Sequence, residues 1–524
     1  MSRVLVADPI AEAGINRLRE HAEVDVELKQ SPASLIARIP DYDALIVRSE
    51  TRVDARVIEA GRRLKVIGRA GAGIDNIDVD AATRAGVLVV NAPSGNTIAA
   101  AEHTMAMMLA LARHIPQADQ AVKAGRWERS RFLGTELREK VLGVVGLGSI
   151  GREVAHRAQA FGMRVIATDP MLSEERASQL SVRLVPFDQL MAEADLVTLH
   201  VPLTRETHHL IDARALARAK PGVRLINVAR GGIVDETALR DALRDGQVAG
   251  AALDVFEQEP PGENPLLSLP QVVTTPHLGA STEEAQISVA LEISDQVLAV
   301  LDGGSPRFAL NAPVALPEAM AFLRPFIPVA EGIGRFYAQV GRQPVSRLQV
   351  GYAGEIATYD CSVLTAALLT AFLSRFSAER VNPVNARTVA AAQGITVVEQ
   401  RDTHASEFAN LISLHATGDH GATRVGGTLL LNEPHIVTFN DFRIDLVPHG
   451  TFLMSWHADR PGVIGAIGTL LGQKNINIAS MQVGRDRPRG DAVMILSVDD
   501  PVPESIQADI RRIPGMADVL TVTL

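Results

Sequence analysis

Three residues in the middle of the chain are of types that together carry out acid–base chemistry on a small anion. Arg230, Glu259 and His277 each follow an apolar run of strand length. A histidine can accept a hydroxyl proton near neutral pH, and a carboxylate beside it can fix its tautomer and favour its charged form. An arginine fork can bind a carboxylate and polarise a developing carbonyl. Beside a nicotinamide, the three would form a complete site for the oxidation of a 2-hydroxy acid.

A glycine motif precedes these residues and predicts where the nicotinamide cofactor binds. Gly146, Gly148 and Gly151 have the spacing G-x-G-x-x-G between an apolar run and a helical segment, and a second apolar strand ends at Asp169. Such glycines allow a tight turn, a close approach to a diphosphate and close helix packing, while the acid binds ribose hydroxyls. A glycine-rich turn of any α/β protein is the alternative. Pro170, rather than an arginine, follows the acid, which favours NAD over NADP.

Two arginines at strand ends near the N-terminus indicate an anionic substrate. Arg48 follows the apolar run 44–47, and Arg69 follows the run 65–68. Ligands of open α/β sheets bind beyond the carboxyl ends of the strands, and guanidinium forks match carboxylate or phosphate groups. The two arginines therefore predict a site for a small polyanion, with surface arginines paired to helix acids as the alternative.

Strand and helix patterns alternate from the N-terminus to about residue 280, and they would position these groups. The strands are continuous apolar runs, which are typical of a parallel sheet with helices on both faces. The turn-rich segment 91–97 predicts a hinge, and the residues 98–113 predict a long buried helix between two domains. Trp127 lies among charged residues on an expected surface segment, which favours a subunit interface.

Length and composition restrict the class of protein. The 524 residues suffice for three or four domains, and a formal charge of −10 provides no basic surface for nucleic acid. A single cysteine, Cys361, excludes a disulfide framework and a Cys-rich zinc site. No apolar run reaches about 18 residues, so we expect no membrane span and a soluble, cytoplasmic protein. His208 and His209 have no further His or Cys at ligand spacing, so no metal site is expected.

The segments 227–235, 252–260 and 275–280 resemble the signatures of the D-isomer-specific 2-hydroxyacid dehydrogenases. The resemblance implies an α/β protein in which a Rossmann-type doubly wound nucleotide domain is inserted in a flavodoxin-like substrate domain. It also implies that Arg230 binds the substrate carboxylate, that His277 is the acid/base and that Glu259 is its partner. The residues that would line NAD are Gly146, Gly148, Ser149, Ile150, Gly151, Asp169, Ala229, Asp254 and Gly279.

Within this family, the segments 66–76 and 127–129 and the long C-terminal extension resemble the branch that acts on 3-phospho-D-glycerate. That branch forms 3-phosphooxypyruvate with NAD in the first step of L-serine biosynthesis. Residues implied to meet the phosphorylated substrate are Arg48, Arg69, Asn96 and, from a second subunit, Arg129. Ala72 stands where relatives often have threonine, which would remove a hydrogen bond near the cofactor. Dehydrogenation of another D-2-hydroxy acid, such as glycerate or 2-hydroxyglutarate, and a non-catalytic NAD-dependent sensor are the alternatives.

The C-terminal half begins with a proline-rich segment, 305–325, which predicts a linker. We expect strands at 350–355 and 428–433 around a helix at 363–376. The resemblance implies an α+β intervening domain that binds an allosteric anion, for which Arg424 and Arg443 are exposed candidates. A packing spacer without a ligand is the alternative.

From residue 451 the pattern is strand–helix–strand–strand–helix–strand, which predicts a small ferredoxin-like domain. It resembles the ACT domain, a regulatory amino-acid-binding module that usually pairs across a two-fold axis. The resemblance implies that His457, Asp459 and Asn477 hold an L-serine effector, although some relatives have a tyrosine in place of the histidine. A domain that only dimerises is the alternative. Paired catalytic and ACT modules imply a homotetramer, or a homodimer.

The expected domain boundaries follow from these segments. They are a substrate-binding domain formed by residues 1–96 and 284–310, an NAD-binding domain at 97–283, an intervening allosteric domain at 311–447 and an ACT domain at 448–524.

Overall fold

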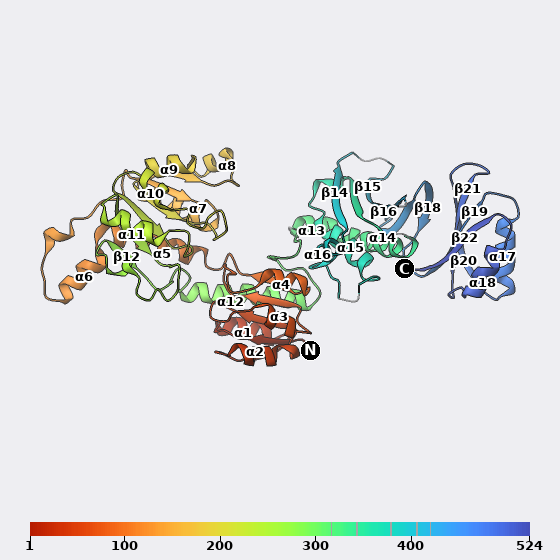
Figure 1. Cartoon of the computed structure of the whole chain (residues 1–524), viewed down its shortest axis with the longest axis horizontal. Helices are drawn as coiled ribbons and strands as arrows, with labels where there is room; N and C mark the ends of the chain where they lie inside the picture. The colour runs from red at the N-terminus through yellow and green to blue at the C-terminus, as the bar shows by residue number, and fades with distance from the viewer. Residues whose placement is uncertain (316, 342–343, 378–379, 405–406, 420) are drawn as a thin grey trace.

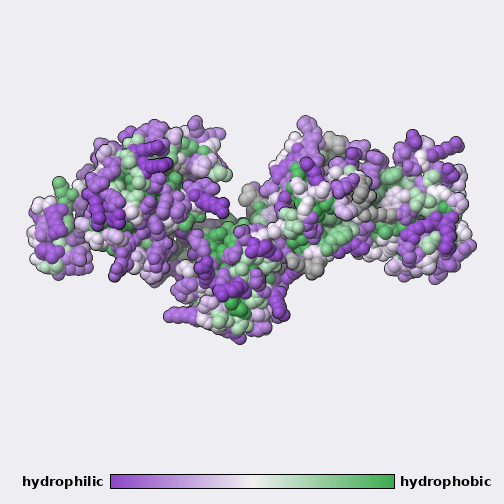
Figure 2. Space-filling model, in the orientation of Figure 1, coloured by the Kyte–Doolittle hydropathy of each residue, from purple (hydrophilic) through white to green (hydrophobic). Residues whose placement is uncertain are grey.

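The computed structural model describes residues 1–315, 317–341, 344–377, 380–404, 407–419 and 421–524. These residues form four sheets. Figure 1 shows an elongated molecule with the two parallel sheets toward one end and the two C-terminal sheets toward the other. None of the helices among the described residues combines the length and the apolar character that a membrane span requires. Hydrophilic residues cover much of the face drawn in Figure 2.

The first sheet contains the N-terminal strands in the parallel order β2-β1-β3-β4-β5, which is the flavodoxin-like order. Its strands are β1 (Arg3–Val6), β2 (Glu23–Val26), β3 (Ala44–Val47), β4 (Val66–Arg69) and β5 (Leu88–Asn91). Its helices are α1 (Glu12–Arg19), α2 (Pro32–Arg38), the short η1 (Ile39–Asp41), α3 (Ala55–Ala60), α4 (Val79–Arg84) and the distant α12 (Glu283–Leu301). Residues of α2, α3 and α4 fill the core on one face, and residues of α1 and α12 fill it on the other.

The second sheet is also parallel, in the order β12-β11-β10-β9-β6-β7-β8. Its strands are β6 (Val141–Val145), β7 (Arg164–Thr168), β8 (Arg183–Leu184), β9 (Leu196–Leu199), β10 (Val223–Asn227), β11 (Val248–Leu253) and β12 (Val272–Thr274). Numbered from β6, the order is that of the doubly wound dinucleotide fold with one additional strand, so the predicted Rossmann-type domain is confirmed.

Helices cover both faces of the second sheet, as the two separate core clusters on it require. They are α5 (Thr97–Arg113), α7 (Ser149–Ala160), α8 (Glu174–Gln179), α9 (Phe187–Glu193), α10 (Ala213–Arg218) and α11 (Glu236–Arg244), with the short turn η3 (Pro265–Ser268). The helix α6 (Ile115–Lys123) projects from the end of α5 away from the sheet and is followed by the short turn η2 (Arg129–Phe132). The predicted long helix is therefore α5, which starts one residue earlier than expected. The chain enters this domain before α5 and leaves it before α12, so the core on one face of the first sheet is completed only after the second sheet.

The third sheet has the order β14-β13-β15-β16-β17-β18. Its strands are β13 (Arg347–Gly354), β14 (Thr396–Asp402), β15 (Asn410–Gly418), β16 (Gly421–Leu430), β17 (Glu433–Phe439) and β18 (Phe442–Leu446). Its helices and short turns are α13 (Pro317–Leu323), η4 (Arg324–Phe326), α14 (Ile327–Val340), η5 (Glu355–Thr358), α15 (Ser362–Leu373) and α16 (Ala386–Ala392).

Two expectations for this region were wrong. The predicted linker 305–325 contains α13 and part of η4, because Leu323 is buried in the core of this module and a proline is tolerated at the start of a helix. The predicted strand 428–433 is the junction of two strands, since Leu431 and Asn432 adopt positive φ angles of 51° and 67° and turn the chain from β16 into β17.

The fourth sheet is antiparallel in the order β20-β21-β19-β22. Its elements are β19 (Thr451–Ala458), α17 (Val463–Gln473), β20 (Ile478–Arg485), β21 (Asp491–Val498), α18 (Glu504–Arg511) and β22 (Met516–Thr523). This succession confirms the predicted ferredoxin-like module.

Candidate active site

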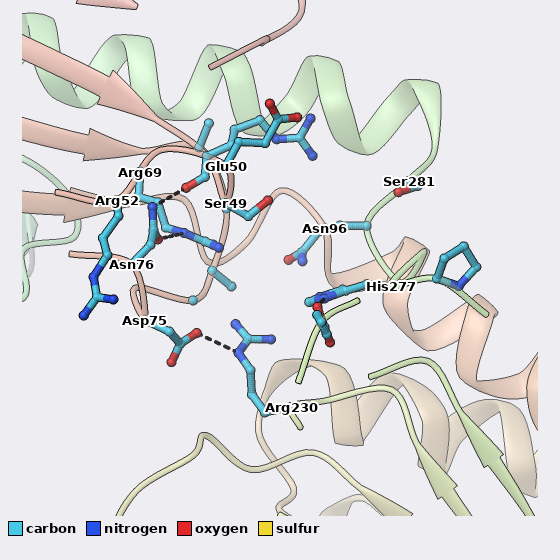
Figure 3. A pocket seen from close by; sticks show the side chains of 18 residues that line it. Ser49, Glu50, Arg52, Arg69, Asp75, Asn76, Asn96, Arg230, His277 and Ser281 are labelled. Atoms are coloured by element: carbon cyan, nitrogen blue, oxygen red, sulfur yellow. Dashed lines mark hydrogen bonds and ion pairs between the residues drawn. The ribbon is translucent and has the colours of Figure 1, made fainter. Parts of the chain in front are cut away.

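A polar cavity of about 740 Å³ lies where the two parallel sheets face each other with the carboxyl ends of their strands (Figure 3). The first sheet contributes Arg48, Ser49, Glu50, Arg52, Arg69 and the loop that contains Asp75 and Asn76. The second sheet contributes Arg230, Glu259, Pro276 and His277. Asn96 and Ser281 come from the two segments, before α5 and before α12, where the chain passes between the two parallel domains. The cavity is therefore formed by both sheets, and neither provides it alone.

Arg230, Glu259 and His277 lie on this cavity because β10, β11 and β12 are adjacent strands. His277 Nδ1 is 2.7 Å from Glu259 Oε2, and Glu259 Oε1 accepts a hydrogen bond from the backbone N–H of Phe256 at 3.2 Å. The histidine side chain is 46% exposed, so its second ring nitrogen remains available to a ligand. A histidine held in this way at Nδ1 can exchange a proton at Nε2.

The carboxylate of Glu259 is the ionised partner of this pair. Burial alone would raise the pKa of Glu259, but the hydrogen bond and the charge of His277 outweigh burial and hold that pKa below its ordinary value. The glutamate thus remains an anion near neutral pH and holds Nδ1 of the imidazole.

A buried carboxylate shapes the turn that presents His277. The histidine has a positive φ of 55°, and its backbone N–H donates to the carbonyl of Asp254 at 2.9 Å. The Asp254 side chain, which has no exposed surface, accepts hydrogen bonds from the backbone of Leu278 at 2.7 Å and of Gly279 at 2.9 Å. Because the carboxylate holds both amides after the histidine, it fixes the conformation of the turn.

Two further side chains, which sequence analysis did not identify, complete this network. Thr275 Oγ1 donates to Asp254 at 2.5 Å, and His103 Nε2 on α5 lies 3.2 Å from Asp254 Oδ1 and 3.1 Å from the threonine hydroxyl. Burial would raise the pKa of Asp254, yet the bonds from His103, Thr275 and Leu278 lower it. His103 lies on α5, which the sequence predicts to be a buried helix. A histidine in such a helix does not by itself indicate a contact with a distant carboxylate.

Arginines are crowded on the opposite side of the cavity. Burial, together with repulsion from Arg230 and Arg48 that Asp75 only partly offsets, lowers the pKa of Arg69 to about 10. A partly desolvated guanidinium beside two like charges is stabilised when an anion binds. Arg48, Arg69 and Arg230 are thus arranged for a ligand with more than one negative charge.

Asp75 and Asn76 contact these arginines and were not among the predicted site residues. Arg230 Nε donates to Asp75 Oδ2 at 3.2 Å, and Arg69 Nε donates to Asn76 Oδ1 at 3.1 Å. Figure 3 shows both contacts at the edge of the cavity. The sequence signals were their place soon after a strand end and their position within the segment 66–76, which carries the family resemblance.

The nucleotide motif has the local geometry that a diphosphate requires. Gly146 has a φ of 88°, and a Cβ on it would lie 2.5 Å from the carbonyl oxygen of His200. A Cβ on Gly151 would lie 2.1 Å from the carbonyl oxygen of Gly146, whereas one on Gly148 would enter open space. No side chain among the described residues caps α7, so its first amide groups, from Ser149 onward, face this open space. The motif therefore fits the phosphates of a dinucleotide.

Asp169 lies at the end of β7, where a dinucleotide ribose would be. Its carboxylate accepts hydrogen bonds from the backbone of Leu147 and of Met171, both at 2.8 Å, so it joins the glycine turn to the end of the neighbouring strand. Ala229, which precedes Arg230, accepts a hydrogen bond from Nη1 of that arginine at 2.7 Å. These positions agree with a cofactor bound across the carboxyl ends of β6, β7 and β10.

Two of the predicted substrate residues differ in their placement. Asn96 lines the cavity, and its Oδ1 is buried without a hydrogen-bond partner within the described part of the chain. Arg129 is exposed on η2 and is not among the residues that line this cavity. The cavity as lined by this single chain therefore does not include Arg129.

Two of the predicted effector residues of the fourth sheet, Asp459 and Asn477, have separate partners, whereas Nδ1 of His457 is buried without a hydrogen-bond partner among the described residues. His457 is buried, and its burial lowers its pKa. Asp459 Oδ2 accepts hydrogen bonds from the backbone of Arg489 at 3.0 Å and from Arg485 Nη1 at 3.3 Å, and the exposed Asn477 donates to Asp499 at 2.8 Å.

The sequence analysis also named two arginines, Arg424 and Arg443, and two histidines, His208 and His209, and the structure gives their surroundings. In the third sheet, Arg443 is exposed and lies 3.7 Å from Glu407, and Arg424 is exposed on β16. His208 and His209 stack on each other in the second domain, and the latter is 3.1 Å from Glu257.

Three family models match successive parts of the chain. Residues 105–279 match the D-isomer specific 2-hydroxyacid dehydrogenase, NAD binding domain. Residues 322–440 match the D-3-phosphoglycerate dehydrogenase intervening domain, and residues 452–515 match the ACT domain. The chain therefore contains an NAD-binding domain of this type.

Similar proteins extend over the whole chain. A D-3-phosphoglycerate dehydrogenase of Synechocystis is 49% identical over 100% of this chain and 95% of its own length, and one of Archaeoglobus fulgidus is 45% identical over 100% of both. Among solved structures, the TT0316 protein of Thermus thermophilus is 38% identical with a TM-score of 0.55, over 59% of this chain and 99% of its own. The D-lactate dehydrogenase of Aquifex aeolicus, complexed with NAD and lactic acid, is 28% identical with a TM-score of 0.55, over 60% of this chain and 100% of its own. On this likeness across its full length, the chain belongs to the D-3-phosphoglycerate dehydrogenase family.

Proposed function

We propose that this protein oxidises 3-phospho-D-glycerate to 3-phosphooxypyruvate with NAD, the first step of L-serine biosynthesis. The observation that carries the proposal is the composition of the cavity. A histidine–glutamate pair and a carboxylate-binding arginine lie on one side, and further arginines lie on the other. A substrate with a carboxylate at one end and a phosphate at the other matches this distribution of charge.

The side chains of the cavity have distinct roles in this reaction. Arg230 binds the substrate carboxylate and polarises the carbonyl that forms at the neighbouring carbon. His277 accepts the proton of the hydroxyl group at Nε2, while Glu259 holds Nδ1 and stabilises the imidazolium that results. NAD, when bound, supplies the hydride acceptor. In the reverse direction the same histidine returns its proton to the carbonyl oxygen.

The other predicted residues bind the two ends of the ligands. Arg48 and Arg69 bind the phosphate, and Asn96 contributes a hydrogen bond to the substrate from the start of α5. Gly146, Gly148, Ser149, Ile150 and Gly151 form the site of the diphosphate, and Asp169 binds the ribose hydroxyls. Ala229, Asp254 and Gly279 border the nicotinamide, with the aspartate acting mainly through the turn that it fixes.

The test is NADH formation from 3-phospho-D-glycerate, D-glycerate and D-2-hydroxyglutarate at equal concentrations. We expect the phosphorylated substrate to have the highest kcat/KM. A higher value for either unphosphorylated acid would contradict the proposed substrate while keeping the dehydrogenase chemistry. Absence of turnover on all three, with NADH still bound, would favour a non-catalytic sensor.

We further propose that the C-terminal modules regulate this activity. The intervening domain, proposed at 311–447, and the ACT domain, proposed at 448–524, follow a catalytic body formed by 1–96, 97–283 and 284–310. L-serine is the proposed effector, bound by His457, Asp459 and Asn477, and a homotetramer is the proposed assembly. Arg129 would then reach the phosphate of the substrate in the neighbouring subunit.

A further inference from the structure

The loop of residues 71–76 contacts the arginines of the cavity from one side. Asp75 accepts a hydrogen bond from Arg230 Nε, and Asn76 accepts one from Arg69 Nε. Because each arginine is held at Nε, the orientation of its guanidinium is set by the loop, and Arg230 is held further by the bond from its Nη1 to the carbonyl of Ala229. We propose that Asp75 and Asn76 are positioning residues that set the spacing between the carboxylate-binding and the phosphate-binding arginines. This inference rests on the substrate proposed above.

The orientation of the Asn76 amide follows from its other contacts. Its Nδ2 donates to the backbone carbonyls of Arg48 at 2.7 Å and of Thr51 at 2.6 Å. Two carbonyl acceptors on one side require the amide nitrogen there, so the amide oxygen must face Arg69. Asn76 therefore joins the two proposed phosphate-binding arginines, one through its backbone and the other through its side chain.

The backbone of the same loop limits where the guanidiniums can lie. A Cβ on Gly73 would lie 2.0 Å from Arg230 Nη2, and one on Gly71 would lie 2.6 Å from Arg69 Nη1. Both guanidiniums thus lie directly against the loop, at positions that any larger residue would occupy. The two glycines do not belong to a second dinucleotide motif. Their contact with the guanidiniums instead explains why both positions lack a side chain.

The two positioning residues act on different ends of the substrate. Asp75 belongs to the first parallel domain but holds Arg230 at the end of β10, so its ion pair crosses between the domains. Asn76 acts within the first domain, on Arg48 and Arg69. Figure 3 shows the two pairs side by side, with His277 across the cavity. Changes at Asp75 should therefore affect every 2-hydroxy acid, whereas changes at Asn76 should affect only phosphorylated ones.

Steady-state kinetics on 3-phospho-D-glycerate and D-glycerate test this difference. For Asn76→Ala we expect kcat/KM to fall about 10- to 100-fold on the phosphorylated substrate and by less than about threefold on D-glycerate, since small misplacements cost rates of this order. For Asp75→Asn we expect losses of about 10- to 100-fold on both substrates, mainly through KM, with an unchanged Kd for NADH. Asp75→Glu, which keeps the charge, should recover part of the loss.

One steric variant tests the loop without removing a hydrogen-bonding group. Gly73→Ala, at a position without a positive φ, should reproduce the general loss of Asp75→Asn. Asp80→Asn is the matched control, because Asp80 is an exposed carboxylate on α4 that is not among the residues lining the cavity. We expect its kinetics to match those of the wild type.

Specific outcomes would overturn the inference. Equal losses on both substrates in Asn76→Ala would contradict a role at the phosphate end alone, and unchanged kinetics in Asp75→Asn and Gly73→Ala would exclude a positioning role. A wild type that prefers D-glycerate would instead contradict the proposed substrate. In that case Asp75→Asn and Gly73→Ala still test the carboxylate end on D-glycerate.

Discussion

The catalytic cavity and the C-terminal ACT module differ in how far their proposed binding residues are already assembled. In the cavity, His277 contacts Glu259 at 2.7 Å and Arg230 contacts Asp75 at 3.2 Å, so the groups that would handle a substrate are held by one another. In the ACT module, Asp459 is held by Arg485 and Arg489, and Asn477 is held by Asp499.

This difference corresponds to two demands on a binding site. Catalysis requires groups that are oriented before the substrate arrives, because reorganisation during the reaction would raise the barrier. A regulatory site must instead change when its ligand binds, since an effector shifts an equilibrium only through contacts that differ between states. An effector of the ACT module would have to displace the present partners of Asp459 and Asn477, or use groups from a second copy.

The largest expected effect is at the acid/base. His277→Ala should lower kcat by roughly 10²- to 10⁴-fold, because it removes the group that accepts the hydroxyl proton. The Kd for NADH, measured by fluorescence titration, should stay the same. A variant that keeps more than about a tenth of the wild-type kcat would contradict an assembled catalytic site around this residue.

Loss of the anionic partner should have the next largest effect and a characteristic pH dependence. The pKa of Glu259 lies below its ordinary value of 4.5, so its deprotonated form, which supports His277, is present above that pH and is lost only as the pH falls through the lower value. Glu259→Gln should reduce kcat by about 10- to 100-fold. It should also shift the acidic limb of the pH profile of kcat/KM to lower pH, because the imidazolium loses the negative charge beside it. A limb that stays in place would exclude this electrostatic role.

The buried carboxylate under the turn should contribute a smaller effect, mainly to stability. Asp254→Asn should destabilise the protein by roughly 1.5–3 kcal/mol near neutral pH, because bonds to a charged acceptor are lost. The pKa of Asp254 is lowered from 3.8, so its contribution is complete above that value and disappears as the pH falls further. Calorimetry of both proteins between pH 3 and 7 measures the difference. A gap that widens at acidic pH would contradict this assignment.

The smallest effect on the basal rate is expected in the ACT module. Asn477→Ala should leave turnover without L-serine within about twofold of the wild type, while the L-serine concentration for half-maximal inhibition rises about tenfold or more, as expected for one lost hydrogen bond in a binding site. An L-serine titration of both proteins measures it. If L-serine does not inhibit the wild type, the proposed L-serine site is contradicted, and the comparison of the cavity with a regulatory site no longer holds.

Most of the fold could be predicted, because continuous apolar strands between helical patterns specify parallel sheets. The residues at the ends of those strands, such as Arg230 and His277, could be predicted for the same reason: neighbouring parallel strands deliver their carboxyl ends to one edge. The boundary errors at 305–325 and 428–433 arose where prolines or a short turn competed with tertiary packing.

The residues that sequence analysis missed act through contacts between distant parts of the chain. Asp75 matters only because the second domain brings Arg230 to it, and His103 only because β11 brings Asp254 to α5. Local patterns carry no information on such pairs. The ACT residues were assigned through family resemblance, and their present partners, Arg485 and Asp499, could not be read from spacing either.

The helix α12, which completes the core on one face of the first sheet, has a consequence for synthesis on the ribosome. Val289, Ile293 and Val297 of that helix fill one face of its core, and Gly14 of α1 lies so close that a Cβ would be 2.7 Å from the carbonyl oxygen of Ala290. At roughly 5–20 residues per second, the ribosome needs on the order of 10–40 s to make the insert and α12. During that time only α1 covers this face of the emerging β1–β5 sheet, and the part that α12 will cover stays exposed. The segment made first therefore cannot complete its core until α12 has been synthesised, and we expect chaperones to bind nascent chains there.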